Sequence, residues 1–479
     1  MRRFASFLAL CIVALPAIGL AQGGSRSAGL YGRGIPGTGG FVPEVWIDGH
    51  PSLNNAQFKI TLERGVGGAN ALLFLSAASA DIPFFNFRLL VDPLTSFGPF
   101  VTTLGGGVGV GGAGNGNLTL PVPNDSGLLG ASLFFQWLVI DSASTSGLVA
   151  SNGLRATLSS GPLVFAGGTS LVEFVPGSGS TTMGPSANNV VDMHFDRTGT
   201  LALVAAANAV VIYDMTSKPR RVLASVTTAS TVNCLAIHPN QARAYVVLPH
   251  RTSPKIEILD TQRSSATFGT LIGSVGMLPS SGLGDMEGCS ISDDGRRLAV
   301  AVMGLIGNKG VLVIDVEPGS STRDQYLKAI PVTIGSFVTD VALSADGTTA
   351  YVCSGNLGPG SLVGMIDLTT GQLKNMASAG DFSVDIDIDP RGRFLVVANP
   401  NSKNLTHVDL RAGSNFFVAS PFPVTNSRFF SVALTPDGSQ AIAVGNGSST
   451  ADIYAFDTAS LRVVWSVTNT MSAAAIAVR

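Results

Sequence analysis

The side chains best suited to chemistry are aspartates and a histidine that recur at equivalent places in a repeated pattern. Asp192, Asp340 and Asp385 lie seven residues before the last residue of a turn, and His194 and Asp387 lie five residues before it. Carboxylates and an imidazole brought together could bind a ligand, hold a divalent cation such as calcium, or exchange protons. These five are the candidate ligand-binding residues; no catalytic residue and no metal site is assigned.

The repeat itself begins near residue 190. Each unit has an apolar strand, a turn, a second apolar strand, a gap and a third strand that ends in aspartate. The turns end 42, 54, 52, 45 and 46 residues apart, at Gly199, Gln241, Gly295, Gly347, Gly392 and Gly438. The strand-ending acids are Asp214, Asp260, Asp315, Asp367, Asp409 and Asp457. Two independent landmarks keep one register over six units, and Asp-Gly between apolar runs favours a tight hairpin.

Repeats of about 40–50 residues with three or four strands each are typical of β-propellers. The C-terminal segment 471–479 resembles a first strand alone, whereas 163–175 resembles a second and a third strand. The C-terminal strand would therefore complete a seventh blade and close the ring, which removes free sheet edges. Residues 160–479 are predicted to form a seven-bladed β-propeller closed by the C-terminal strand.

In such a ring the first strands lie nearest the central channel, so the five candidate residues would meet at the channel mouth. Repulsion between Asp340 and Asp385, on adjacent blades, could raise the pKa of one of them, or a cation could bind between them. Alternatively, each carboxylate accepts backbone N–H bonds from the neighbouring blade or meets channel water. The sequence leaves both interpretations open.

Two segments carry a family resemblance. Residues 346–352 (DGTTAYV) and 437–444 (DGSQAIAV) resemble the YVTN-type propeller repeats of bacterial surface and periplasmic proteins. They are also similar to seven-bladed lactonase-like propellers. The resemblance covers about residues 160–479 and implies the fold; it says little about function, because the shared residues form turns and pack blades.

The N-terminal third divides into three parts. Residues 1–21 combine Arg2 and Arg3 with an apolar run and small residues before Gln22, as a cleaved secretory signal peptide does. Residues 22–40 are predicted to be a flexible Gly-rich lead. Residues 41–158 contain short strand-like runs separated by turns, which predicts an antiparallel β-sandwich. The run from Gln136 to Asp141 resembles a small β module of secreted bacterial proteins.

Several function classes are disfavoured. The formal net charge is −2, and no basic block suggests nucleic-acid binding. The glycines at 107, 109 and 112 match a dinucleotide-binding motif but precede a strand, so a flexible loop is expected instead. No transmembrane segment follows the leader. Cys234, Cys289 and Cys353 are expected to be buried hydrophobes, with one disulfide as the alternative.

The sequence thus predicts an all-β, exported and monomeric protein of the periplasm, cell surface or exterior. Its expected role is non-enzymatic binding of a protein, polymer or small ligand. One alternative is a lactonase-like hydrolase acting at the channel mouth, where His194, Asp192 and Asp385 lack an evident arginine partner other than Arg479. A further alternative is a structural component of the envelope.

Overall fold

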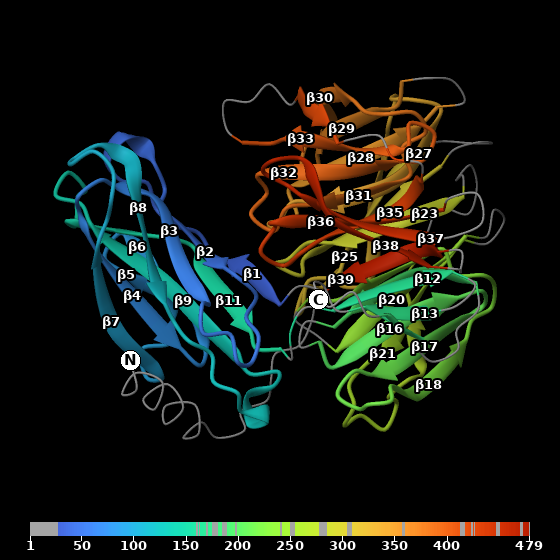
Figure 1. Ribbon diagram of the computed structural model, residues 1–479, viewed down its shortest axis with the longest axis horizontal. Coiled ribbons are helices and arrows are strands. Elements are labelled where there is room, and N and C mark those ends of the chain that lie inside the picture. The colour runs from blue at the N-terminus through green and yellow to red at the C-terminus, as the bar shows by residue number, and fades with distance from the viewer. Residues whose placement is uncertain are drawn as a thin grey trace. The chain divides into compact units, whose positions relative to one another are not determined.

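The computed structural model describes the following parts of the chain, given as residue numbers: 27–159, 161, 163–168, 171–174, 181–183, 189–196, 199–239, 242–249, 254–276, 285–303, 309–356, 360–411, 417–422, 425, 427–446, 451–469 and 473–478. The expected leader and parts of the turns ending at Gly199 and Gln241 lie outside these residues. The chain divides into two compact units, Ser27–Pro162 (unit 1) and Leu163–Arg479 (unit 2). Both consist of β-strands (Figure 1).

Unit 1 contains two main antiparallel sheets. The larger has the order β1 (Ala28–Tyr31), β11 (Gly153–Thr157), β9 (Ser132–Ile140), β4 (Asn70–Ser76) and β7 (Ser96–Thr103), with β10 (Leu148–Ala150) also paired to β9. The smaller is β2 (Glu44–Asp48), β3 (Lys59–Val66) and β8 (Gly111–Thr119), and β5 (Ser79–Phe84) pairs with β6 (Phe87–Val91). Two short 3-10 turns, η1 (Thr38–Gly40) and η2 (Ser126–Leu128), complete the unit. No α-helix occurs in the described residues.

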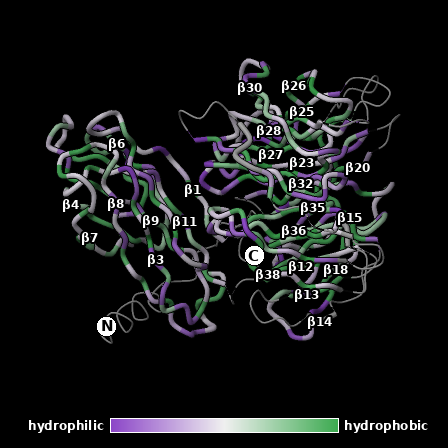
Figure 2. The backbone as a smooth tube through the Cα atoms, turned by 45° about the horizontal axis from the view of Figure 1, so that its top comes forward, coloured by the Kyte–Doolittle hydropathy of each residue, from purple (hydrophilic) through white to green (hydrophobic). Residues whose placement is uncertain are grey.

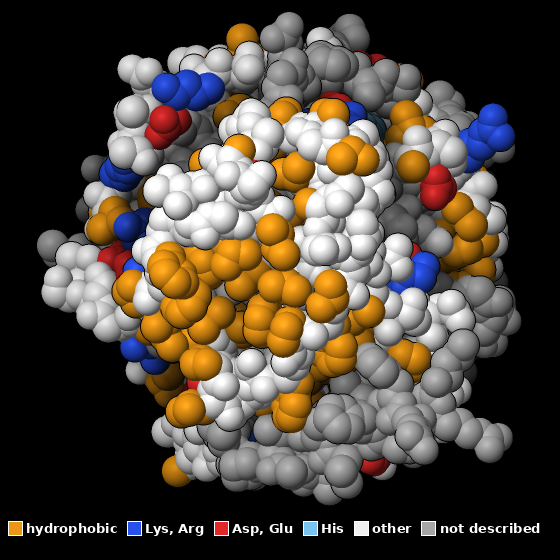
Figure 3. Space-filling view, turned by 90° about the vertical axis from the view of Figure 1, so that its left-hand side faces the viewer, with side chains coloured by type: hydrophobic (Ala, Val, Ile, Leu, Met, Phe, Trp, Pro, Cys, Tyr) orange, Lys and Arg blue, Asp and Glu red, His pale blue; other side chains and the backbone are white. Residues whose placement is uncertain are grey.

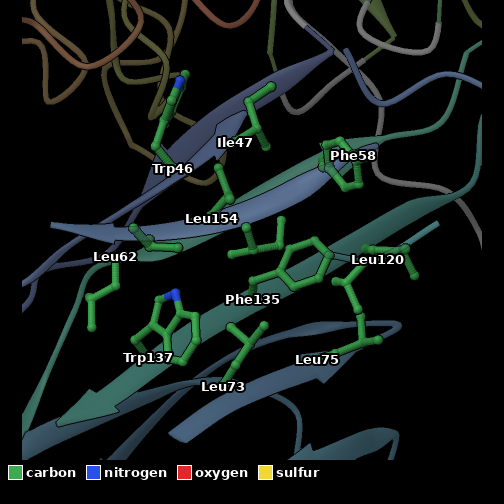
Figure 4. Packing of buried hydrophobic residues seen from close by; sticks show 14 of the residues in the cluster. Trp46, Ile47, Phe58, Leu62, Leu73, Leu75, Leu120, Phe135, Trp137 and Leu154 are labelled. Carbon is green, nitrogen blue, oxygen red and sulfur yellow. The ribbon is translucent and has the colours of Figure 1, made fainter. Parts of the chain in front are cut away.

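Alternating apolar residues from the two main sheets form one core. Trp46 and Ile47 of the smaller sheet pack with Leu73, Phe135 and Trp137 of the larger one (Figure 4). All five are at most 1% exposed, and the indole N–H of Trp137 donates to the carbonyl of Thr61 in the facing sheet. Two sheets that bury one face of each against the other make a β-sandwich, as predicted.

Two expectations about glycine-rich segments are wrong. The segment 22–40, expected to be a flexible lead, contains β1, which pairs with β11 and buries Ala28 in the core. The expected flexible loop after Gly107 becomes strand at Gly111, because β8 pairs with β3. A Cβ at Gly114 would lie 2.6 Å from the backbone of Val66, so glycine permits this close approach.

Unit 2 contains, within its described residues, seven four-stranded antiparallel sheets. In chain order of their first strands, six of them are β15 (Val190–Phe195), β16 (Leu201–Ala206), β17 (Ala209–Asp214), β18 (Arg221–Thr227); β19 (Cys234–Ile237), β20 (Arg243–Leu248), β21 (Lys255–Asp260), β22 (Leu271–Ser274); β23 (Met286–Ile291), β24 (Arg297–Val302), β25 (Gly310–Asp315), β26 (Gln325–Pro331); β27 (Phe337–Leu343), β28 (Thr349–Gly355), β29 (Leu362–Asp367), β30 (Gln372–Ser378); β31 (Asp385–Ile388), β32 (Phe394–Asn399), β33 (Asn404–Asp409), β34 (Phe417–Pro421); and β35 (Arg428–Leu434), β36 (Gln440–Asn446), β37 (Ala451–Asp457), β38 (Arg462–Asn469).

The remaining sheet joins the two ends of unit 2. Its strands are β39 (Ala473–Val478), β12 (Val164–Gly168), β13 (Leu171–Phe174) and β14 (Thr181–Met183). Each first strand contacts the first strand of the next sheet, and β39 contacts both β35 and β15. The sheets therefore form a ring, and unit 2 is a β-propeller closed by the C-terminal strand, as predicted.

Both landmarks of the sequence repeat have structural roles. The turn glycines have positive φ, between 63° and 73°, at Gly199, Gly295, Gly347, Gly392 and Gly438, which an L side chain adopts only with strain. Each repeated aspartate ends the third strand of its sheet. Asp214, for example, accepts a hydrogen bond from the N–H of Thr216 at 3.0 Å and so stabilises the following turn.

Hydrophobic segments run through the strands of both units (Figure 2). In the propeller, side chains from adjacent sheets form shared clusters. One such cluster joins Tyr245 and Val247 of β20 to Val300 of β24. Each blade thus buries its faces on its neighbours, which is why a ring of blades is stable where one blade is not.

Candidate functional site

Three of the five predicted residues link the first strands of adjacent blades. The Oδ2 atom of Asp192 accepts the N–H of Leu235 at 2.7 Å, and that of Asp385 accepts the N–H of Val432 at 2.8 Å. Asp340 makes the same link to Ile386 at 3.1 Å. A buried carboxylate that accepts N–H bonds is stabilised in its ionised form. These acids therefore act as clamps between blades.

Asp387, two residues after Asp385 on β31, makes a second kind of clamp. Its Oδ2 accepts the N–H of Leu434 at 2.7 Å, and its Oδ1 accepts the N–H of Ile388 at 2.8 Å. Ser290 occupies the equivalent position two blades earlier, and its hydroxyl accepts the N–H of Leu343 at 3.2 Å. The clamp is thus a recurring device of the propeller that uses whichever short polar side chain the blade carries.

Asp340 and Asp385 lie on adjacent first strands and interact electrostatically. Burial, together with the charge of Asp385, raises the pKa of Asp340 well above its usual range. Burial also raises the pKa of Asp385. A Cβ at Gly288, the equivalent position in the preceding blade, would lie 1.6 Å from Oδ1 of Asp340. Because Gly288 has no side chain, the carboxyl group of Asp340 has room at this position.

His194 faces carboxylates from its own blade and from across the ring. Its Nε2 lies 3.3 Å from Oδ2 of Asp192. Burial disfavours the imidazolium, but Asp192, Asp387 and Asp385 together raise the pKa of His194 above its usual value. The structure therefore brings all five predicted residues into one electrostatic cluster along the first strands. His194 and Asp192 keep 33% and 23% of their side-chain surface exposed.

The other inward positions of the first strands carry small residues. Five of these side chains are only 3–7% exposed: Cys234, Ala236, Ala342, Ala475 and Ala477. The remaining four positions, Gly288, Ser290, Ser431 and Ala433, are half-buried. Of the described residues, no group of three or more His, Cys, Asp or Glu is placed to hold a metal ion.

His238 is a link between blades that the sequence analysis did not identify. The imidazole is fully buried, and its Nε2 lies 3.0 Å from the carbonyl oxygens of Gly295 and Val316 in the next blade. Burial lowers the pKa of His238 to about 4 despite these carbonyls. A neutral imidazole that donates one N–H is therefore another link between blades.

Unit 1 carries a feature that the sequence analysis did not identify. On the larger sheet, Val101 of β7 and Leu138 of β9 both pair with Leu72 of β4, so the three side chains point to the same side, away from the core. The β5–β6 hairpin covers part of this side by packing Phe87 against Leu138. We define the outer apolar face as Leu72, Phe74, Ile82, Phe84, Phe85, Val101 and Ile140.

Much of the outer apolar face is exposed to solvent. Phe85 is 79% exposed, Val101 61% and Ile140 46%. Figure 3 shows a broad group of hydrophobic side chains on this side of unit 1. The signal in the sequence was the mostly apolar strand β9, Ser132–Ile140, in which Gln136 alone interrupts the apolar residues after Ser132, because a strand with one solvated face alternates apolar with polar residues.

No family model matches the chain, and no curated protein matches it by sequence. Solved structures do resemble it. A periplasmic gluconolactonase of Pseudomonas aeruginosa is 16% identical, with a TM-score of 0.51 over 66% of this chain and 98% of its own. A protein described as a 6-phosphogluconolactonase of Bacteroides fragilis is 15% identical, with the same TM-score and shares. A functionally unknown protein of Desulfotomaculum acetoxidans is 14% identical, with a TM-score of 0.53 and the same shares.

These likenesses define the class of the protein by its fold alone. At such identities a shared β-propeller says nothing about a shared reaction. The matched share of the chain is about as large as unit 2, Leu163–Arg479. In the part of the chain that the structure describes, no helix is long and apolar enough to cross a membrane.

Proposed function

We propose that this chain is an exported, non-enzymatic β-propeller protein that binds a protein partner at the cell envelope or outside the cell, through the outer apolar face of unit 1. The observation that carries the proposal is the exposure of Phe85, in the turn of the β5–β6 hairpin, and of Val101, on the outward side of β7, at 79% and 61%. Contiguous exposed apolar surface on a folded protein marks an interaction site, because water disfavours it.

The composition of the outer apolar face favours a protein over other partners. None of its seven members is charged, and phenylalanine is enriched, as at the centre of protein interfaces. The nearest charges on the hairpin, Arg88 and Asp81, form an ion pair with each other. Attraction to an anionic lipid surface would instead require unpaired lysine or arginine.

Export is supported by the sequence pattern of residues 1–21, by the resemblance to YVTN-type repeats and by the β module resemblance near Gln136. Expression of the full chain in a bacterial host tests export directly. Intact mass of the periplasmic or secreted protein should correspond to a chain that begins at Gln22. A full-length product retained in the cytoplasm would refute export.

The partner surface is tested by placing a photo-activatable amino acid at Phe85 or, as a matched control, at Val464 of the propeller, which is 51% exposed. A protein captured only from Phe85 is then purified, and its Kd is measured against the Phe85→Ser/Val101→Ser variant and a Val464→Ser control. We expect binding to weaken at least about tenfold in the first and to stay unchanged in the control.

Two outcomes would refute this surface. An affinity equal for the wild type and the Phe85→Ser/Val101→Ser variant would show that the partner binds elsewhere. Capture of a second copy of the chain, with dimers in sedimentation equilibrium that dissociate in the variant, would assign the outer apolar face to self-association. That second result would favour a structural component of the envelope.

A lactonase-like hydrolase at the channel mouth is the second candidate. The 3.3 Å approach of His194 to Asp192 and the fold likeness to gluconolactonases support it. Against it, the carboxylates around His194 raise the pKa of its imidazole, which favours the protonated form over the neutral form that a general base requires. Hydrolysis of gluconolactone by the wild type that disappears in His194→Gln would establish the enzyme; no turnover in either would support the binding protein.

A further inference from the structure

Two cysteines lie on the first strands of adjacent blades. Cys234 begins β19 and Cys289 lies within β23, and these two strands are in direct contact. Both residues belong to the same apolar cluster, in which Cys234 is 4% exposed. The two thiols lie close enough for each to affect the pKa of the other. No disulfide joins them in the structure, where all three described cysteines are free.

Their positions follow the clamp rule of the propeller. In three other blades, the position seven residues before the end of the turn holds an aspartate that reaches the backbone of a residue on the next blade, as Asp192 reaches Leu235 and Asp385 reaches Val432. Cys234 occupies the aspartate position, and Cys289 occupies the position of Leu235 and Val432 in the next blade. Of the described junctions between blades, this one has cysteine at both positions.

The junction between β19 and β23 therefore replaces a charge-assisted clamp with a thiol pair. A thiol is a weak acceptor, so a reduced Cys234 holds the next blade less firmly than an aspartate does. A covalent bond between the same two side chains would more than restore the link. Cys353 differs, because its Sγ lies 3.2 Å from Oγ1 of Thr339 on its own blade and it is fully buried.

We propose that Cys234 and Cys289 form a disulfide that joins the first strands of two adjacent blades. In the reaction the two thiols lose two protons and two electrons, and one S–S bond forms. The electrons pass by thiol–disulfide exchange to a disulfide oxidant, which is reduced to two thiols. Oxidising compartments outside the cytoplasm supply such oxidants. In the cell the bond thus depends on the proposed export, but its formation can be tested on purified protein.

The bond would close a loop of roughly 50 residues that contains β20, β21 and β22. Restricting a loop of that length in the unfolded chain stabilises the folded state, unless the bond is strained. Burial raises the pKa of both thiols, so oxidation of the folded protein is expected to be slow and oxidation during folding faster. The bond would act as a structural link between blades with no role in turnover.

The test uses protein that lacks residues 1–21 and therefore Cys11. It is unfolded and refolded with oxidised and reduced glutathione, then denatured, treated with N-ethylmaleimide and weighed intact. We expect one adduct in place of three, and digestion without reductant should yield a peptide pair linked through Cys234 and Cys289. Cys353→Ser is the matched control and should take no adduct, whereas Cys234→Ser should take two.

Thermal unfolding gives a second readout. Oxidised wild type and Cys353→Ser should melt roughly 5 °C above their reduced forms, and Cys234→Ser should not respond to reductant. Three adducts after oxidative refolding, or a bond to Cys353, would overturn the inference; the linked-peptide analysis of the wild type decides this even if a variant fails to fold. Because these measurements need neither secretion nor a partner, failure of the proposed function would leave them unaffected.

Discussion

The carboxylate of Asp385 accepts the backbone N–H of Val432 at 2.8 Å, and this bond ties two blades together at the centre of the ring. The residues whose side chains could bind a ligand or exchange protons thus have a structural role. A carboxylate satisfies a buried N–H at a point where adjacent first strands cannot form a sheet with each other. Asp385 also raises the pKa of His194, so the same carboxylate both links two blades and interacts electrostatically with the imidazole.

The clamps should be measurable as stability. Asp387→Ala leaves the N–H of Leu434 without its acceptor, and we expect unfolding free energy to fall by about 2 kcal/mol. Asp387→Asn keeps the shape and one acceptor oxygen, so it should lose less than half as much. Urea unfolding followed by circular dichroism measures both. Equal losses would show that charge, and not the hydrogen bond, is what Asp387 contributes.

The Asp340–Asp385 pair should make stability fall at high pH. The pKa of Asp340 is raised in the folded state, so its proton stabilises the fold at low pH and is lost as the pH rises through the folded value. Asp340→Asn mimics the protonated form. Its stability relative to wild type should therefore increase between pH 5 and pH 9 in calorimetric scans. A constant difference across this range would contradict the raised pKa of Asp340.

The same pair provides a test for a cation. Because both carboxyls already accept bonds from backbone N–H groups, we expect millimolar Ca²⁺ to leave the melting temperature of the wild type unchanged near neutral pH. The Asp340→Ala/Asp385→Ala variant should be equally indifferent. Stabilisation by Ca²⁺ of the wild type but not of the variant would instead establish a cation site at these carboxyls.

The strand-ending aspartates should govern acid unfolding. Burial opposes ionisation of several of them, but hydrogen bonds from the following turn lower the pKa of each, to about 2 for Asp214. A lowered folded pKa contributes stability above about pH 4 that is lost as the pH falls toward 2. Asp214→Asn should be roughly 1 kcal/mol less stable at pH 7 and depend less on pH below 4. Glu317→Gln is the control and should follow the wild type.

Closure of the ring depends on β39, which pairs with β12 from Val164 to Gly168. Deleting residues 471–479 should open the propeller and leave β12 as a free edge, with loss of soluble protein and of the cooperative thermal transition. Moving the same residues to precede Leu163, joined by a short turn, should restore both, because β39 and β12 are antiparallel neighbours. A stable, soluble deletion variant would contradict closure by this strand.

The sequence alone determined the propeller, because its turns and strand ends are local chemistry. Gly347 is needed for a positive φ, and Asp367 accepts N–H groups two and three residues ahead. The equivalent aspartate therefore recurs in all six repeats, and the glycine in all but the one whose turn ends at Gln241. The closing strand could be predicted because six complete repeats are flanked by a lone first strand at one end and a second and third strand at the other. Alignment of the first strands also brought the five candidate residues to the ring centre, since strand position in a blade determines distance from the axis.

Only the tertiary structure decided what those residues do. Whether Asp385 faces solvent or the N–H of Val432 depends on the distance between two blades that are far apart in sequence. The thiol contact of Cys234 with Cys289 has the same origin. The exposure of Phe85 likewise depends on how the β5–β6 hairpin packs on the larger sheet, where Phe87 contacts Leu138. Local residue types specify turns and strands, but neighbours brought together by folding specify which groups are satisfied and which remain exposed.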